Sequence, residues 1–425
     1  MYFFLSSDVV LVHGVNKGAL YNLRNGGIYS ISREARLLLD NLDRGASLKD
    51  TIGNNQSEYL DRIRELGLGD YHRFLHQRPI TDTINRPKRR LNQLWLCLSN
   101  NCNLNCLHCY ADCRNGRAEL NIPLECILDS VAEAKRSFDL RCVQLIGGEP
   151  LMLKSEIVAT IIESARGNGI PSVEIFTNGH FLTPYYLDLF EEYDVSVAVS
   201  VYSPTATDHD LITTKPGSWL RTVSAIRKLV QRGITTRIAA VATSVNMMTV
   251  AGVSNWAREE FGISMPKPYD VVRTCGRGAT TENIPWEMFV DQHVRTAPEF
   301  IPASRHLLEK TLYGNVCWST SACIMPNGDV TPCEMEIQTI QGNITDRSLT
   351  EILTASASAA QDLSKDNIEI CRDCEYRYVC WECRAMANQL GTGPKMKPAT
   401  CMYDPYSGKW SPKPNDFSTL LSGST

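Results

Sequence analysis

The sequence lacks three features that would assign it to a membrane, secreted or nucleic-acid-binding class. No window holds about 18 uninterrupted apolar residues, the length that a membrane-spanning helix needs. The opening segment MYFFLSSDVVLVHG has neither the basic start nor the small-residue cleavage site of a secretory signal peptide. Charge is nearly balanced, with 43 Lys and Arg against 47 Asp and Glu and no long run of one sign. We therefore expect a cytoplasmic protein without membrane or nucleic-acid partners.

Cysteine, by contrast, is abundant. The chain has 16 cysteines among 425 residues, many of them closely spaced. Disulfide scaffolds are short and secreted, whereas this chain is long and is expected in a reducing compartment. Clustered thiols in such a compartment indicate metal ligands. The length also allows two or three domains, each with its own core.

Cys102, Cys106 and Cys109 form a C-x₃-C-x₂-C run directly after the apolar segment 94–98. Three thiolates can hold three corners of a [4Fe–4S] cluster and leave one iron without a protein ligand. A structural zinc site needs four ligands, usually as paired C-x₂-C units. Zinc is therefore the weaker alternative here, even if Cys113 is counted as a fourth ligand.

The run CNLNCLHCY closely resembles the cluster signature of radical S-adenosylmethionine (SAM) enzymes. The resemblance implies that SAM binds the open iron through its amino and carboxylate groups. It also implies that an electron from the cluster splits SAM into methionine and a 5′-deoxyadenosyl radical. His108 takes the place of a usual aromatic residue whose backbone faces the adenine.

From residue 91 onward, apolar strands alternate with amphipathic helices. About six β–α units with continuously apolar strands indicate an α/β fold with a parallel sheet. Their length suits a partial (β/α)₆ TIM-like barrel over 91–285. In such folds the active site lies at the carboxyl ends of the strands.

Polar residues follow three of these predicted strands. Two glycines let a ligand approach the backbone closely, and a neighbouring carboxylate can pair with an ammonium group. The resemblance implies that the GGE segment after the second strand contacts the SAM amino group. It implies that the polar residue after the fourth strand contacts the SAM ribose or carboxylate. The Asn-Gly pair after the third strand either lines the pocket or forms a turn. The residues are Gly147, Gly148 and Glu149 after the second strand, Asn178 after the third, and Ser200 after the fourth.

Two nearby positions are less typical of the family. Tyr202 stands where many relatives carry an acid. Asp210 lies in a segment that resembles a family loop but is equally suited to cap a helix. This part of the predicted SAM site therefore departs from the family's pattern.

Residues 1–75 predict a small winged-helix-like domain. Short β segments with an Asn-Gly-Gly turn at 25–27 are followed by helices, the first with Ser32 as its N-cap. This order resembles peptide-recognition domains fused to enzymes that mature ribosomally made peptides, and implies a precursor-peptide partner. A packing or oligomerisation domain is the alternative. Residues 76–90, with prolines and a basic KRR, predict a linker.

Residues 286–425 hold eight cysteines that divide into two sets of four. Two such sets suffice for two fully ligated [4Fe–4S] clusters, with zinc knuckles as the alternative. The arrangement resembles the SPASM extension of radical SAM peptide-modifying enzymes, although the last C-x₂-C is one residue shorter than in relatives. The resemblance implies a first auxiliary set of Cys317, Cys323, Cys333 and Cys383, and a second of Cys371, Cys374, Cys380 and Cys401.

Glu334 directly follows Cys333, where sulfatase-maturing relatives carry an acid that takes a substrate proton. Burial beside a negatively charged cluster would raise its pKa and suit it to act as a general base. A solvated or structural glutamate is the alternative.

The combined patterns predict a radical SAM/SPASM oxidoreductase with SAM and three [4Fe–4S] clusters. We expect it to abstract hydrogen from a ribosomally made precursor peptide and to form a crosslink or another oxidised residue, with a flavodoxin- or ferredoxin-type reductant. Alternatives are a peptide epimerase, a residue-excising enzyme and a sulfatase-type formylglycine maturase. A non-catalytic iron–sulfur or zinc-binding interaction module is disfavoured, because it needs no open iron and no GGEP segment.

Overall fold

The computed structural model describes residues 1–425 except 52–53, 76–87, 392 and 423–425. The chain folds into two compact units, each built from separate stretches of sequence. Unit one contains 1–88, 294–316 and 359–425, and unit two contains 89–293 and 317–358. None of the described helices is long and apolar enough to cross a membrane.

Nothing tests the predicted domain boundaries after residues 75, 90 and 285, which stay predictions. The linker predicted at 76–90 lies mostly outside the described residues.

The N-terminal part of unit one follows the predicted order of strands and helices. Its elements are β1 Tyr2–Leu5, β2 Val9–His13, β3 Gly18–Asn22, β4 Ile28–Ile31, α1 Arg33–Asp43, α2 Leu48–Thr51, α3 Asn54–Glu65 and β5 Gly69–His72. β2, β3 and β4 form an antiparallel sheet, and β1 pairs with β5.

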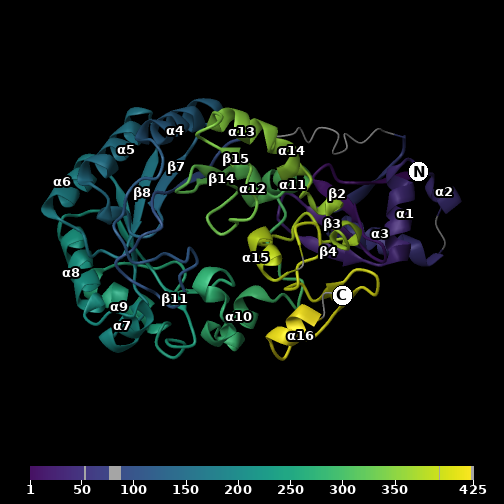
Figure 1. Cartoon of the computed structure of the whole chain (residues 1–425). Coiled ribbons are helices and arrows are strands. Elements are labelled where there is room, and N and C mark those ends of the chain that lie inside the picture. The colour runs from purple at the N-terminus through teal and green to yellow at the C-terminus, as the bar shows by residue number, and fades with distance from the viewer. Residues whose placement is uncertain (52–53, 76–87, 392, 423–425) are drawn as a thin grey trace. The chain divides into compact units, whose positions relative to one another are not determined.

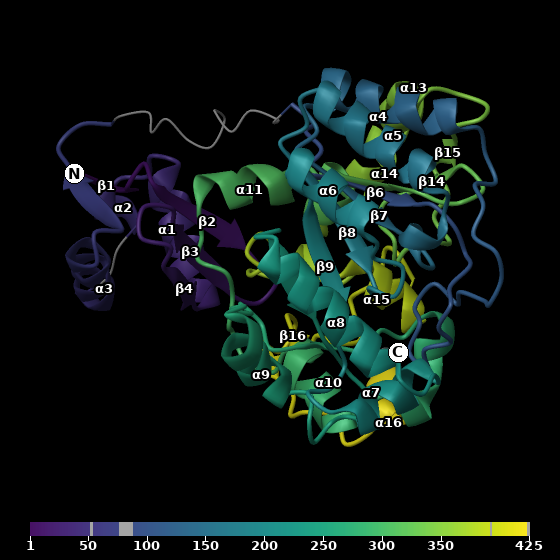
Figure 2. The same cartoon turned by 90° about the vertical axis from the view of Figure 1, so that its left-hand side faces the viewer.

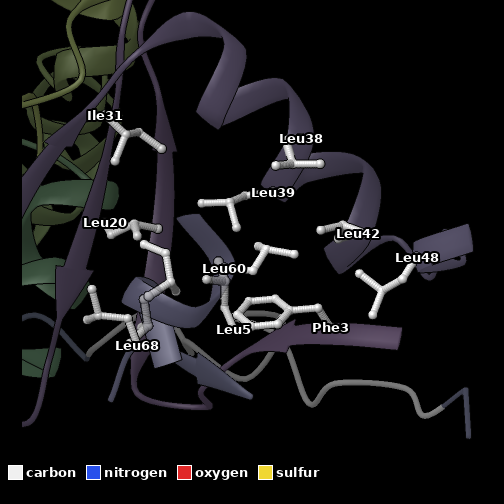
Figure 3. Packing of buried hydrophobic residues seen from close by; sticks show 12 residues of the cluster. Phe3, Leu5, Leu20, Ile31, Leu38, Leu39, Leu42, Leu48, Leu60 and Leu68 are labelled. Atoms are coloured by element: carbon white, nitrogen blue, oxygen red, sulfur yellow. The ribbon is translucent and has the colours of Figure 1, made fainter. Parts of the chain in front are cut away.

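Local sequence signals explain these elements. Gly26 has a φ of 81°, which permits the tight turn between β3 and β4. Ser32 Oγ accepts a hydrogen bond from Ala35 N at 3.2 Å and so caps α1, as predicted. The apolar face of α1 then joins Phe3 of β1 and Leu60 of α3 in one buried cluster (Figure 3).

The opposite face of this sheet packs on the C-terminal part of the same unit. Val12 and Tyr21 share a buried cluster with Tyr376 and Tyr403. Tyr21 Oη donates to the carbonyl of Glu375 at 2.6 Å. Residues more than 350 positions apart in the sequence therefore form one core.

Unit two is built on one large sheet (Figures 1 and 2). Its strands are β6 Gln93–Cys97, β7 Cys142–Ile146, β8 Ser172–Thr177, β9 Ser196–Ser200, β10 Thr236–Ala239, β13 Ser321–Ile324, β14 Asp329–Thr331 and β15 Gly342–Asn343. They lie in the order β10-β9-β8-β7-β6-β13-β14-β15, and β6 to β10 are all parallel. A short parallel pair, β11 Val241–Ala242 and β12 Asp270–Val271, follows β10.

The connecting helices of unit two are α4 Leu124–Phe138, α5 Ser155–Gly167, α6 Pro184–Glu192, α7 Ala206–Thr213, α8 Ser218–Gln231, α9 Gly252–Phe261 and α10 Trp286–His293. Of these, α4, α5, α6 and α8 lie along the outer side of the sheet (Figure 1). The remaining elements are α11 Arg305–Leu312, α12 Val316–Thr320, α13 Leu349–Ala355, α14 Ala357–Gln361, α15 Arg384–Gln389, β16 Tyr403–Asp404, β17 Lys409–Trp410 and α16 Phe417–Ser422. The parallel strands with intervening helices confirm the predicted α/β class and partial barrel.

Candidate functional site

The loop between β6 and α4 carries Cys102, Cys106 and Cys109, at the carboxyl end of the first barrel strand. The end of α7 supports this loop, since Leu107 N donates to the carbonyl of Ile212 at 2.9 Å. The loop thus lies where the sequence places the active site.

Arg277 is a supporting residue that the sequence did not indicate. Its Nε donates to the carbonyl of Cys106, and its Nη1 donates to the carbonyl of Cys113, both at 2.8 Å. Nη1 also pairs with Asp112 Oδ1 at 2.8 Å. The preceding Gly276 has a φ of 54°, and a Cβ there would lie 2.4 Å from the carbonyl oxygen of Cys109. The Gly-Arg-Gly sequence after β12 was the available signal.

The predicted GGE segment packs directly on the backbone of the cysteine loop. Gly147 has a φ of 126°, and Gly148 N donates to the carbonyl of Ser99 at 2.7 Å. A Cβ on Gly148 would lie 1.9 Å from the carbonyl oxygen of Asn101, so no larger residue fits without a backbone shift. The two glycines are therefore required for the close approach of β7 to this loop.

Glu149 is buried, and both of its carboxylate oxygens accept hydrogen bonds from the protein. Its carboxylate accepts hydrogen bonds from Thr177 Oγ1 at 2.6 Å, Asn178 N at 2.7 Å and Leu151 N at 3.1 Å. Burial raises the pKa of Glu149 to about 7, against the opposing effect of these bonds. The carboxylate ties together the ends of β7 and β8, and its contact with SAM stays a prediction.

Asn178 forms the Asn-Gly turn, one of its two predicted roles, and its lining of the SAM pocket stays a prediction. The following Gly179 has a φ of 81° and makes the turn. The side-chain amide of Asn178 lies 3.8 Å from Cys102 Sγ and donates to Asn103 Oδ1 at 2.8 Å. Asn178 therefore contacts the first cysteine of the loop.

The aromatic rings of His108, Tyr202 and His209 pack together at the cysteine loop. Tyr202 packs edge-on to His108 with ring centroids 4.5 Å apart, and stacks on His209 at 5.4 Å. Burial lowers the pKa of both histidines to about 4, so both are neutral at pH 7. Burial raises the pKa of Tyr202, and the nearby Cys106 adds to this effect. A buried tyrosine thus stands beside the cysteine loop at the position where the sequence departs from the family's pattern.

The thiols of the loop influence one another. Burial raises the pKa of Cys102 to about 11 and of Cys106 to about 12, and neighbouring thiolates add to both effects. A hydrogen bond with the Cys113 thiol lowers the pKa of Cys109 to about 6. Three thiols in one loop are the donor type that a [4Fe–4S] cluster takes, and they lose their protons when they bind iron. The donor type therefore fits such a cluster, and the ligation itself stays a prediction.

The second auxiliary set lies entirely within unit one. The thiolates of Cys380 and Cys401 are near enough to reinforce the effect of burial, which raises the pKa values of Cys371 and Cys374. The charges of Cys380 and Cys401 thus act on both Cys371 and Cys374, and the grouping of the four around one cluster stays a prediction.

The first auxiliary set is divided between the units. Cys323 lies within β13 and is fully buried, and the thiolate of Cys333 is among the charges that affect its pKa. Cys383 belongs to the other unit, so its place in this set stays a prediction. Across the described residues, no three histidine, cysteine or acidic side chains are arranged closely enough to hold one metal ion, and all three ligand sets stay predictions.

Glu334 has a carboxylate oxygen, Oε2, that is covered from solvent and has no hydrogen-bond partner among the described residues. Burial raises the pKa of Glu334 to about 7, although Arg273 opposes the shift. These properties suit a general base, the role predicted for it.

Asp210 caps a helix, which is one of its two predicted roles. Its carboxylate accepts hydrogen bonds from Gly217 N at 2.6 Å and Trp219 N at 2.8 Å, at the start of α8. The carboxylate is thus satisfied by the backbone.

Comparison with known proteins identifies two domains in the chain. Residues 96–262 match the model of the radical SAM superfamily, and residues 317–375 match that of the SPASM iron–sulfur cluster-binding domain. A GTP 3′,8-cyclase of Alkaliphilus oremlandii is 28% identical over 43% of this chain and 55% of its own length. The chain thus spans only about half of that relative.

Two further relatives and one solved structure extend the match. The AdoMet-dependent heme synthase of Methanosarcina barkeri is 25% identical over 72% of this chain and 95% of its own length. The subtilosin biosynthesis protein AlbA of Bacillus subtilis is 24% identical over 56% of this chain and 54% of its own. The structure of Streptococcus suis SuiB bound to precursor peptide SuiA aligns with a TM-score of 0.53 and 14% identity over 93% of this chain and 98% of SuiB. The chain therefore contains a radical SAM domain and, after it, a SPASM iron–sulfur cluster-binding domain.

Proposed function

We propose that this chain is a peptide maturase that removes hydrogen from a ribosomally made precursor peptide and forms a crosslink or another oxidised residue. The observation that carries the proposal is the extent of the likeness to SuiB, whose structure holds a precursor peptide. The likeness covers 93% of this chain, so it includes most of the region before the radical SAM domain. The relation to AlbA, a bacteriocin biosynthesis protein, supports the same substrate class.

Cys102, Cys106 and Cys109 would hold the cluster whose open iron binds SAM and supplies the electron for its cleavage. Arg277 and the GGE segment hold the cysteine loop in place. The rings of His108 and Tyr202 pack against each other beside the loop.

Glu334 would accept the substrate proton that is lost during oxidation. A pKa of about 7 lets its carboxylate take up a proton near neutral pH. The two auxiliary cysteine sets would hold fully ligated clusters, which suit electron transfer and thus a net two-electron oxidation. A flavodoxin- or ferredoxin-type protein would supply the reducing electron.

The deciding experiment is the mass of a precursor peptide, encoded near this gene, after anaerobic reaction in deuterated water. Loss of two hydrogens with fragmentation blocked between two residues supports a crosslink, and the same loss without a block supports another oxidised residue. An unchanged formula with one deuterium gained at Cα would reveal an epimerase, and loss of a residue-sized fragment would reveal excision.

Replacement of Cys102, Cys106 and Cys109 by Ala should abolish 5′-deoxyadenosine formation. Wild-type protein should hold about twelve iron atoms for three clusters.

We also propose that the leader of the peptide adds as a strand to an edge of the β2-β3-β4 sheet. β4 is an edge strand of this sheet, and Ile28, Tyr29 and Ser30 are at least partly exposed. Leader peptide should therefore increase the hydrogen-exchange protection of amides in β4 but not in α5. Unchanged exchange in the whole sheet would leave residues 1–75 with a packing role.

A further inference from the structure

Arg295 contacts two cysteines of the second auxiliary set, Cys380 through its side chain and Cys401 through its backbone. Its Nη1 donates to Cys380 Sγ at 2.9 Å, and its Nη2 donates to the carbonyl of Trp381 at 3.1 Å. Its own backbone forms a parallel bridge with Cys401. The guanidinium carbon lies 5.1 Å from the ring centroid of Phe300, which fixes it from another side. The arginine is thus held against the sulfur of Cys380.

A second cation lies near the same sulfur. Lys365 is buried, and its Nζ pairs with Glu382 Oε1 at 3.0 Å. Lys365 and Cys380 line the same small cavity of unit one. The side chain of Lys365 is therefore close to Cys380, one of the predicted cluster ligands.

The charges of this group do not cancel. Glu382 Oε1 is shared between Lys365 and Arg384, whose Nη2 lies 2.6 Å away. Glu382 thus faces two cations with one carboxylate, and Arg295 adds a third cation to this group.

We propose that Arg295 and Lys365 raise the reduction potential of the [4Fe–4S] cluster held by Cys371, Cys374, Cys380 and Cys401. The inference rests on the proposed function, because it requires this set to hold a cluster. Reduction adds a negative charge to the cluster, and a fixed cation or an N–H···S bond stabilises the reduced form more than the oxidised form. A raised potential makes this cluster a better acceptor for an electron removed from the peptide. Arg295 and Lys365 are positioning residues in this account.

The test is a potentiometric titration followed by electron paramagnetic resonance on the full chain, reconstituted anaerobically. Replacement of Cys102, Cys106 and Cys109 by Ala leaves only the auxiliary signals. In this background Arg295→Gln and Lys365→Met should each move one auxiliary potential to a more negative value, and the other signal should stay unchanged. Arg295→Lys, which keeps the charge, should move it less. Arg305→Gln, at an exposed arginine of the same unit, should move neither.

Iron analysis separates the possible failures. About eight iron atoms per chain with unchanged potentials in Arg295→Gln and Lys365→Met would overturn the inference and leave the proposed function intact. Loss of about four of those atoms in the variants would also overturn it, because these residues would then only hold the ligand loops together. If the second set holds no cluster even without these substitutions, the proposed cofactor count fails and the inference fails with it.

Discussion

Single buried polar side chains hold the candidate site together. Glu149 accepts three hydrogen bonds from two strand ends and the following turn, and Arg277 donates to two carbonyls of the cysteine loop. The cysteines, Glu149 and Asn178 could be found from spacing and from their place after apolar strands. Arg277 was missed, because its only local signal is the two flanking glycines, which by themselves do not indicate a contact with the cysteine loop.

Replacement of Arg277 by Met should loosen the cysteine loop. The change removes hydrogen bonds to the carbonyls of Cys106 and Cys113 and the ion pair with Asp112. Bonds to a charged group contribute about 1.5–3 kcal/mol each. We expect faster loss of about four iron atoms per chain on dilution, and less SAM cleavage. Arg227→Met, at a half-exposed arginine of α8, should retain iron as the wild type does.

The raised pKa of Glu149 predicts a pH-dependent stability. Between its ordinary pKa of 4.5 and its folded value of about 7, the folded carboxyl holds a proton that the unfolded one has released. The free energy of unfolding should therefore fall as pH rises through this window, by up to about 3 kcal/mol on a scale of about 1.4 kcal/mol per pKa unit.

Urea unfolding of metal-free protein at pH 5 and pH 7.5 measures this effect. Glu149→Gln should show a smaller fall than the wild type, whereas Glu163→Gln, at an exposed position of α5, should show the same fall. Equal falls in Glu149→Gln and wild type would contradict the assignment.

At the scale of elements, the barrel strands were predictable because parallel strands buried on both faces are apolar along their length. The capped α1 and the turn before β4 were predictable from local chemistry at Ser32 and Gly26. The pairing of β13 with β6 was not, because a four-residue strand has no distinctive period and its partner lies more than 200 positions earlier.

The close packing of β7 on the cysteine loop makes Gly148 sensitive to any side chain. Gly148→Ala places a Cβ against the backbone of Asn101, so we expect a loss of at least about 3 kcal/mol of unfolding free energy together with the first cluster. Gly167→Ala is the matched control, since Gly167 ends α5 with nothing within 4 Å of the added Cβ. It should be neutral or stabilising by up to about 1 kcal/mol. Similar melting curves for both variants would refute the packing argument.

At the scale of the whole molecule, the composition of the two units could not be read from sequence. Contacts between residues several hundred positions apart leave no local pattern. The structure shows that residues 1–75 share a core with the segment that carries the second auxiliary set. Deletion of residues 1–75 would therefore uncover Tyr376 and Tyr403, and it would disturb more than peptide binding.

A smaller change tests this shared core. Tyr21→Phe removes the buried hydrogen bond to the carbonyl of Glu375, the residue after Cys374, and should cost about 1–3 kcal/mol. We expect earlier thermal unfolding and faster loss of iron from the second auxiliary set, with SAM cleavage retained. Tyr185→Phe, at a tyrosine with 47% of its surface exposed, should have no effect. Iron retention equal to the control would show that the two segments are energetically independent.

The shared core also determines when the N-terminal sheet can be completed in the cell. Tyr21 and its acceptor at Glu375 are 354 positions apart, and ribosomes add roughly 5–20 residues per second. The face of the sheet that carries Val12 and Tyr21 therefore waits roughly 20 to 70 s for its partner to be synthesised. During this time its apolar surface is open to chaperones, to other nascent chains and to aggregation. This sheet thus leaves the ribosome long before it can reach all of its native contacts.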